Sequence, residues 1–190
     1  MLRINKIVAM DNKAAEGNER QAEWFAKETG VRHEVVQVPV SDILFGEKSE
    51  MESIEQAVAL LHQGKDVLLI TEATWSRVKL DASNEAGKRV GMDAIIVSQK
   101  VQQMLGSIAK AVLKRTTIFG LFLSGGDTAI GVFEEIGATG SQILGEVLVG
   151  IPLMRLSGGE FDGMKVITKA GAFGNEDAIS FCLRKLKESL

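Results

Sequence analysis

Cysteine and histidine are scarce in this chain of 190 residues, which contains one Cys and two His. The single Cys182 excludes a disulfide framework and is most simply a buried small hydrophobic residue. His33 and His62 lie apart from each other and from the cysteine, so neither a zinc site nor a cysteine–histidine nucleophile is indicated. This cysteine usage fits a reducing compartment, and we expect a cytoplasmic protein.

Concentrated positive charge is also lacking, because 22 Lys and Arg residues are outnumbered by 25 Asp and Glu, and the pI is near 5.5. The short basic run "LRKLK" (183–187) is interpreted as the solvated face of a last helix. We therefore expect no nucleic-acid partner. The apolar run near the N-terminus is too short for a signal peptide or a membrane span, so no membrane association is expected.

The common phosphate-binding fingerprints are missing too. The glycine–lysine pairs at Lys65 and Lys88 lack both the upstream glycine and the downstream hydroxyl of a P-loop, and no G-x-G-x-x-G motif follows a strand. A P-loop or a Rossmann dinucleotide site of the usual type is therefore excluded.

What remains is a regular alternation of strand-like and helix-like segments. Strands are predicted at 4–10, 33–40, 66–71 and 115–123, and helices at 14–30, 49–64, 92–115 and 127–137. Later apolar runs at 147–149, 151–156 and 164–168 are separated by turn residues and predict a small antiparallel portion near the C-terminus. The sequence therefore predicts one α/β domain, a mainly parallel sheet with flanking helices.

The segment "FLSGGDTAIG" (122–131) joins a predicted strand to a predicted helix. Gly125 and Gly126 let a ligand approach the backbone, and the N–H groups at a helix start favour anions. We expect Asp127 or Thr128 to cap the helix. Since a carboxylate repels a bare phosphate, Asp127 either serves as that cap or holds Mg²⁺. The alternative that this loop is only a tight turn and a helix cap stays open.

A second strand, loop and helix follow in "TKAGAFGNEDAISF" (168–181). Ligands of parallel sheets sit beyond the carboxyl ends of the strands, so the two loops can meet on one rim. Gly171 and Gly174 are favoured as nucleotide contacts, although they could simply permit a turn, with Phe173 as a core plug. Lys169 is either a phosphate contact or an ordinary lysine at a strand end.

Two tryptophans are candidates for stacking a nucleotide base. Trp24 lies on the apolar face of a predicted helix, so it is expected in the core. Trp75 follows a strand end and is the better candidate of the two, although a surface anchor is favoured for it.

The blocks "SGGDTAIGVFEEIG", "GIPLMRLSGG" and "TKAGAFGNEDAI" occur in this order over residues 124–179. In this order and spacing they resemble the C-terminal nucleotide-binding domain of the four-carbon acid sugar kinases, a family that includes threonate, erythronate and 3-oxo-tetronate kinases. The resemblance implies ATP and Mg²⁺ as cofactors, with Asp127 as the candidate metal ligand. The nucleotide site that it implies consists of Ser124, Gly125, Gly126, Asp127, Thr128, Gly171, Phe173 and Gly174.

The resemblance extends over residues 1–190 as the nucleotide-binding half, so the expected function is transfer of the terminal phosphate to a hydroxyl of a four-carbon acid sugar. The sugar-acid-binding domain is expected as a separate partner, and no catalytic residue is identified. Family members tend to have a Gly-Ser loop where Met10 and Asp11 stand here. A non-catalytic nucleotide- or anion-binding regulatory module and a structural interaction domain without a ligand remain alternatives, and a homo-oligomer is left open.

Overall fold

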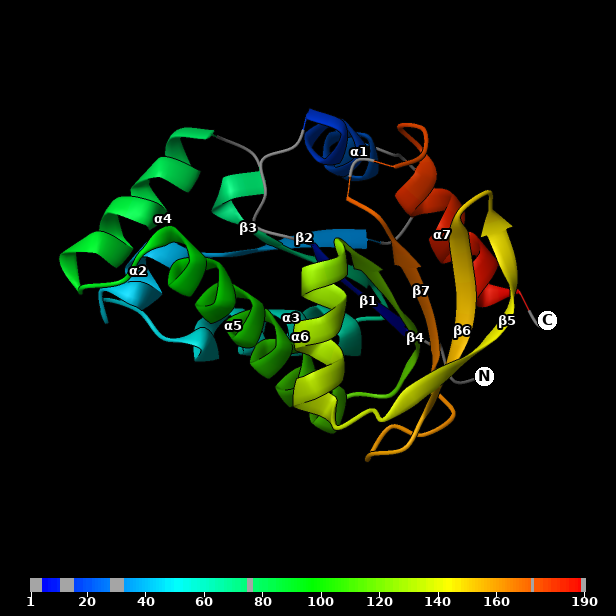
Figure 1. Ribbon diagram of the computed structural model, residues 1–190. Helices are drawn as coiled ribbons and strands as arrows, with labels where there is room; N and C mark the ends of the chain where they lie inside the picture. The colour runs from blue at the N-terminus through cyan, green and yellow to red at the C-terminus, as the bar shows by residue number, and fades with distance from the viewer. Residues whose placement is uncertain (1–4, 11–15, 28–32, 75–76, 172, 189–190) are drawn as a thin grey trace.

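A mixed β-sheet forms the centre of the computed structural model, which describes residues 5–10, 16–27, 33–74, 77–171 and 173–188 (Figure 1). Across the sheet the strands follow the order β2-β3-β1-β4-β7-β6-β5. The parallel strands are β1 (Asn5–Met10), β2 (His33–Val38), β3 (Asp66–Thr71), β4 (Ile118–Ser124) and β7 (Lys165–Lys169). At one edge, β6 (Ile151–Ser157) and β5 (Gly140–Leu148) run antiparallel.

Helices cover both faces of this sheet (Figure 1). One face carries α1 (Glu16–Lys27) and α7 (Ala178–Lys187), which contact each other. The opposite face carries α3 (Glu50–His62), α5 (Ala94–Arg115) and α6 (Gly126–Ile136). The remaining helices, α2 (Val40–Leu44), the 3₁₀ turn η1 (Glu72–Thr74) and α4 (Arg77–Arg89), lie together beside α5. Within the described residues, no helix has the length and apolar character required to cross a bilayer.

The strand β3, which lies between β2 and β1, shows why the core has two halves. Every residue of this strand is buried. Val67 and Leu69 pack towards α3 and α5, whereas Leu68 and Ile70 pack towards α1 and α7. Because successive side chains of a strand point to opposite faces, a strand covered on both sides has a continuous apolar sequence.

The predicted α/β class, the mainly parallel sheet and the antiparallel portion near the C-terminus are confirmed. The prediction for the first antiparallel strand was too short, because β5 begins at Gly140 rather than at residue 147. Residues 140–146 are all exposed on the sheet edge, so no buried apolar run marks them in the sequence. Their strand conformation depends on pairing with β6, which is not a local signal.

The carboxyl ends of three neighbouring strands lie level with one another. Met10 of β1 pairs with Ser124 of β4, and Ser124 pairs with Lys169 of β7. The helix after β4 lies on one face of the sheet, whereas the helices after β1 and β7 lie on the other. Connections that leave adjacent parallel strands in opposite directions open a crevice at the strand ends, the usual position of a ligand in such folds.

Candidate functional site

The connection from β4 to α6 is very short. Ser124 ends the strand, Gly125 is the N-cap with φ 95° and ψ 129°, and α6 begins at Gly126. The prediction that Asp127 or Thr128 caps this helix is wrong, because both residues lie within its first turn. A positive φ is strained for residues with a side chain, so the chain needs glycine at the cap position itself.

The start of α6 is open to solvent at Gly126. A Cβ atom built on Gly126 would meet no atom of the described residues within 4 Å, apart from its chain neighbours and the backbone of its own helix. The first hydrogen bond of the helix runs from the Ala129 N–H to the Gly125 carbonyl at 3.0 Å, so the N–H groups of Gly126 and Thr128 precede the regular hydrogen bonds of the helix. Such N–H groups, together with the helix dipole, favour an anion.

Thr128 lies beneath this opening. Its side chain is 1% exposed, and its Oγ1 atom has no hydrogen-bond partner among the described residues. A buried hydroxyl without a hydrogen-bond partner is uncommon in folded proteins. The Thr128 hydroxyl therefore places a polar atom just behind the open start of α6.

The two glycine loops meet on one rim, as predicted. The Gly125 N–H donates to the Lys169 carbonyl at 2.8 Å, and the Ser124 hydroxyl donates to the Gly171 carbonyl at 3.4 Å. The structure therefore brings Ser124, Gly125 and Gly171 into direct contact, with Gly126 and Asp127 immediately adjacent.

Lys169 is not an ordinary lysine at a strand end, because its side chain is only 2% exposed. Its ammonium group donates to the Ala170 carbonyl at 3.2 Å and also to the Gly171 carbonyl. Burial lowers the pKa of Lys169 to about 8, and Cys182 opposes this shift. These two hydrogen bonds of the Lys169 ammonium group hold the start of the second loop. The sequence did not predict this role.

Phe173 and Gly174 lie farther along the second loop. The interpretation of Phe173 as a core plug is wrong, because the side chain is half exposed and rests on the turn between β5 and β6. A Cβ atom on Gly150 in that turn would lie 3.1 Å from the Phe173 ring. Gly174 has φ 89°, and a Cβ atom there would approach the Ala178 Cβ to 2.9 Å. The turn into α7 therefore requires glycine at position 174.

A pocket of about 580 Å³ lies between α1 and this second loop. Arg20, Gln21 and Trp24 line one side, and residues 174–177 line the other. Trp24 is 47% exposed, so the prediction that it belongs to the core is wrong. Ala22 and Phe25 make the apolar contact of this helix with the sheet, and Trp24 is displaced from Phe25 by about 100° around the helix.

Gln21 was not singled out by the sequence. Its Nε2 atom donates to the carbonyls of Phe173 at 3.0 Å and Gly174 at 3.2 Å. No pattern in the sequence could have indicated this contact, because it joins residues more than 150 positions apart.

No group of three or more His, Cys, Asp or Glu side chains that could hold a metal ion occurs in the part of the chain that the structure describes. Asp127 is partly exposed on the first turn of α6. A protein-bound magnesium ion is commonly coordinated by one or two carboxylates, water and phosphate oxygens. The Asp127 carboxylate, beside the helix start that favours an anion, fits that pattern. Asp11 and Trp75 lie outside the described residues.

A family model described as "Nucleotide-binding C-terminal domain" matches residues 15–179. The D-threonate kinase of Salmonella typhimurium is 35% identical over 136 residues, which cover 71% of this chain and 31% of that protein. The D-erythronate kinase of Heliobacterium modesticaldum is 34% identical over 89 residues, which cover 46% of this chain and 20% of that protein. The chain therefore spans about a third or less of the curated relatives that it matches.

Solved structures share the fold. A DUF1537 protein of Bordetella bronchiseptica, described as a domain-swapped dimer with bound citrate, superposes with a TM-score of 0.71 at 23% identity and covers 95% of this chain and 41% of its own. A DUF1537 protein of Haemophilus influenzae gives a TM-score of 0.71 at 18% identity, covering 96% of this chain and 40% of its own.

Proposed function

The chain belongs to the nucleotide-binding C-terminal domain family of the four-carbon acid sugar kinases, and from this premise we propose that it binds ATP on the rim formed by the loops after β4 and β7. The observation that carries the proposal is the open start of α6 at Gly126, where the described residues outside this helix place no atom within 4 Å of a built Cβ. It lies at the crevice where neighbouring connections leave the sheet on opposite faces.

The phosphates would occupy the space in front of Gly126. The N–H groups of the first turn of α6 would donate to phosphate oxygens, assisted by the helix dipole. Gly125 and Ser124 are fixed by their bonds to β7 and its loop, so these donors are held in place before a ligand arrives. Lys169 contributes by holding the start of the second loop, because its ammonium group donates to the carbonyls of Ala170 and Gly171.

Asp127 is the residue that would hold Mg²⁺. Its carboxylate would share the ion with phosphate oxygens and water. A bound Mg²⁺ would neutralise the charge that the carboxylate and the phosphates bring together, while Asp127 would fix the position of the phosphate chain relative to α6.

The reaction that we propose is transfer of the terminal phosphate to a hydroxyl of a four-carbon acid sugar. A bond forms between the acceptor oxygen and phosphorus, the bond to the bridging oxygen of ADP breaks, and the acceptor hydroxyl releases its proton. The acceptor and its base would be supplied by a sugar-acid-binding partner outside these 190 residues. The partial coverage of the threonate and erythronate kinases supports this division of labour. A cytoplasmic location and a homo-oligomeric state stay predictions.

The test is release of ADP with D-threonate or D-erythronate, measured for the chain alone and with a separately expressed sugar-acid-binding portion of a kinase relative. We expect no acceptor-dependent turnover by the chain alone, because in-line transfer requires both substrates to be held together. We expect turnover when the partner is present. Acceptor-dependent turnover by the chain alone would contradict the proposed division, and nucleotide binding without turnover in any combination would favour a regulatory module.

A further inference from the structure

We call the proposed phosphate position at the start of α6, in front of Gly126, the phosphate seat. The pocket between α1 and residues 174–177 is a separate site, but it is close to this seat. Gly171 touches Ser124 at the seat, and Gly174 lines the pocket. The three residues from Gly171 to Gly174 span at most about 11 Å when fully extended. A molecule with its phosphates at α6 therefore has this pocket within reach of its other end.

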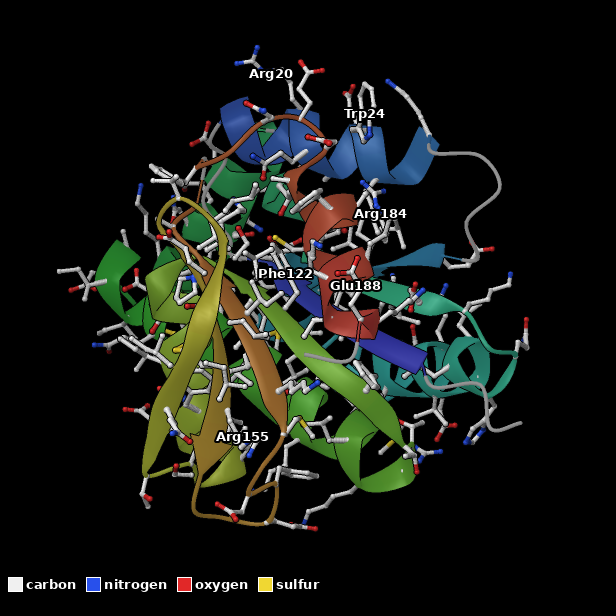
Figure 2. The ribbon with its side chains drawn as sticks, turned by 90° about the vertical axis from the view of Figure 1, so that its right-hand side faces the viewer. Arg20, Trp24, Phe122, Arg155, Arg184 and Glu188 are labelled. Carbon is white, nitrogen blue, oxygen red and sulfur yellow. The ribbon has the colours of Figure 1, made fainter. Side chains whose placement is uncertain are left out.

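The pocket presents an aromatic surface beside polar groups. Trp24 is 47% exposed, an unusual exposure for a large indole on a helix that packs against the sheet. In Figure 2, Arg20 and Trp24 both extend from α1 at the top of the view. On the other wall, Glu176 and Asp177 supply carboxylates that accept hydrogen bonds from hydroxyl or amino groups.

The wall opposite Trp24 is held by a specific contact. Gln21 is 1% exposed, and its Nε2 atom donates to the carbonyls of Phe173 and Gly174. Both amide hydrogens are used in this way, which leaves the Oε1 atom as an acceptor. That atom is buried at the pocket wall and has no partner among the described residues.

We infer that this pocket holds the nucleoside of the bound nucleotide, with the adenine base on the Trp24 indole and the ribose hydroxyls towards Glu176 and Asp177. The inference rests on the proposed function, because it assigns the other end of the same ligand. An indole face stacks on any base, and carboxylates commonly bind ribose hydroxyls. Gln21 acts as a positioning residue that fixes the second wall.

The test separates the base from the phosphates by comparing ATP with inorganic tripolyphosphate. The chain contains two tryptophans, so a Trp75→Phe background leaves Trp24 as the only indole fluorophore. We expect ATP to quench the emission of Trp24, because stacking places the base on the indole, and tripolyphosphate to bind without quenching. Calorimetry with both compounds supplies the affinities.

Variants of the pocket sharpen the comparison. We expect Trp24→Ala to weaken ATP binding roughly 5- to 100-fold, the range found for removing a stacked base contact, without changing the affinity for tripolyphosphate. Trp24→Phe retains part of the ATP affinity. Ile143→Ala on β5 is the matched control, because this side chain is also apolar and is 70% exposed, away from the pocket.

The outcomes distinguish the two proposals. If ATP and tripolyphosphate both fail to bind the folded protein, the phosphate seat and the base pocket are both wrong. If both compounds bind, but ATP neither quenches Trp24 nor loses affinity in Trp24→Ala, the base lies elsewhere and only the pocket assignment is overturned.

Discussion

The two glycine loops at the rim differ in how the fold holds them. The loop after β4 passes from strand to helix through Gly125, whose N–H and carbonyl are both engaged by backbone hydrogen bonds. The loop after β7 needs residues 170–177 to reach α7, and side chains from other parts of the protein hold it. These side chains include Ser124 of β4 and Gln21 of α1. The first loop is held by backbone hydrogen bonds to its own helix and to β7, whereas the second depends on side-chain contacts.

This difference suggests different tasks for the two loops. A helix start that is held by backbone bonds keeps its N–H donors in place without a ligand, which suits phosphate oxygens of constant shape. A longer loop held by side chains can adjust to a larger ligand surface, which suits a base and a ribose. Substitutions in the two loops should therefore have different consequences for stability and binding.

The largest effect is expected from Gly126→Val. A branched side chain would occupy the space in front of the first turn of α6, so ATP affinity should fall about tenfold or more. The melting temperature should change by less than about 2 °C, because no other element in the described part of the chain comes within 4 Å of the new Cβ.

Gly125→Ala is the contrasting variant of the same loop. The positive φ of Gly125 should make an alanine there cost about 1–3 kcal/mol of stability, measured by denaturant unfolding. If Gly126→Val proves as destabilising as Gly125→Ala, or if it leaves ATP affinity unchanged, the loop is only a turn.

Lys169 gives the second prediction, the pH dependence of stability. Its pKa is lowered to about 8 in the folded protein, whereas the ordinary value is 10.5. Between these values the unfolded chain binds a proton that the folded chain has released, so raising the pH favours folding. Lys169 should therefore add a rise in stability from pH 8 towards pH 10, and Lys169→Met should lack it.

Cys182 must be separated from this effect, because burial raises its pKa to about 12 from the ordinary value of 9.0. Its contribution has the opposite sign, since the unfolded thiol loses its proton first as the pH rises. Because the two groups interact, the comparison is made in a Cys182→Ala background, where the difference in unfolding free energy between Lys169 and Lys169→Met at each pH isolates the lysine. A difference that does not vary with pH would show that Lys169 is solvated.

The third prediction concerns the second loop. Gln21→Met keeps the length of the side chain but removes both donors to the loop carbonyls, so it should cost about 1 kcal/mol. Hydrogen exchange should accelerate in residues 173–178 and stay unchanged in α6, because the loop after β4 does not depend on Gln21. Equal acceleration in both regions would mean that the two loops form one cooperative unit.

The smallest effect is expected from Asp127→Asn. If the carboxylate shares Mg²⁺ with the phosphates, ATP affinity should fall about two- to fivefold in the presence of Mg²⁺. Without Mg²⁺ the same variant should bind ATP equally well or better, because a repulsive charge has been removed. A loss of equal size under both conditions would contradict the metal role.

Periodic and apolar patterns in the sequence predicted much of the fold, because they report burial along one element. The buried strand β3, the helix α3 and the meeting of the two glycine loops were all predicted correctly. The exposed part of β5 and the contact of Gln21 with Phe173 were missed, because both depend on partners that are distant in sequence. Trp24 was misplaced because an apolar residue beside the core stripe resembles one within it.

The most direct test of the central claim is calorimetric titration of the chain with ATP in the presence of Mg²⁺, for the wild type and Gly126→Val. We predict binding by the wild type in roughly the micromolar to millimolar range that is usual for substrate sites, and a loss of about tenfold or more in a variant that remains folded. Absence of binding by the wild type, or equal affinity in both proteins, would contradict the assignment of the start of α6 as the phosphate seat.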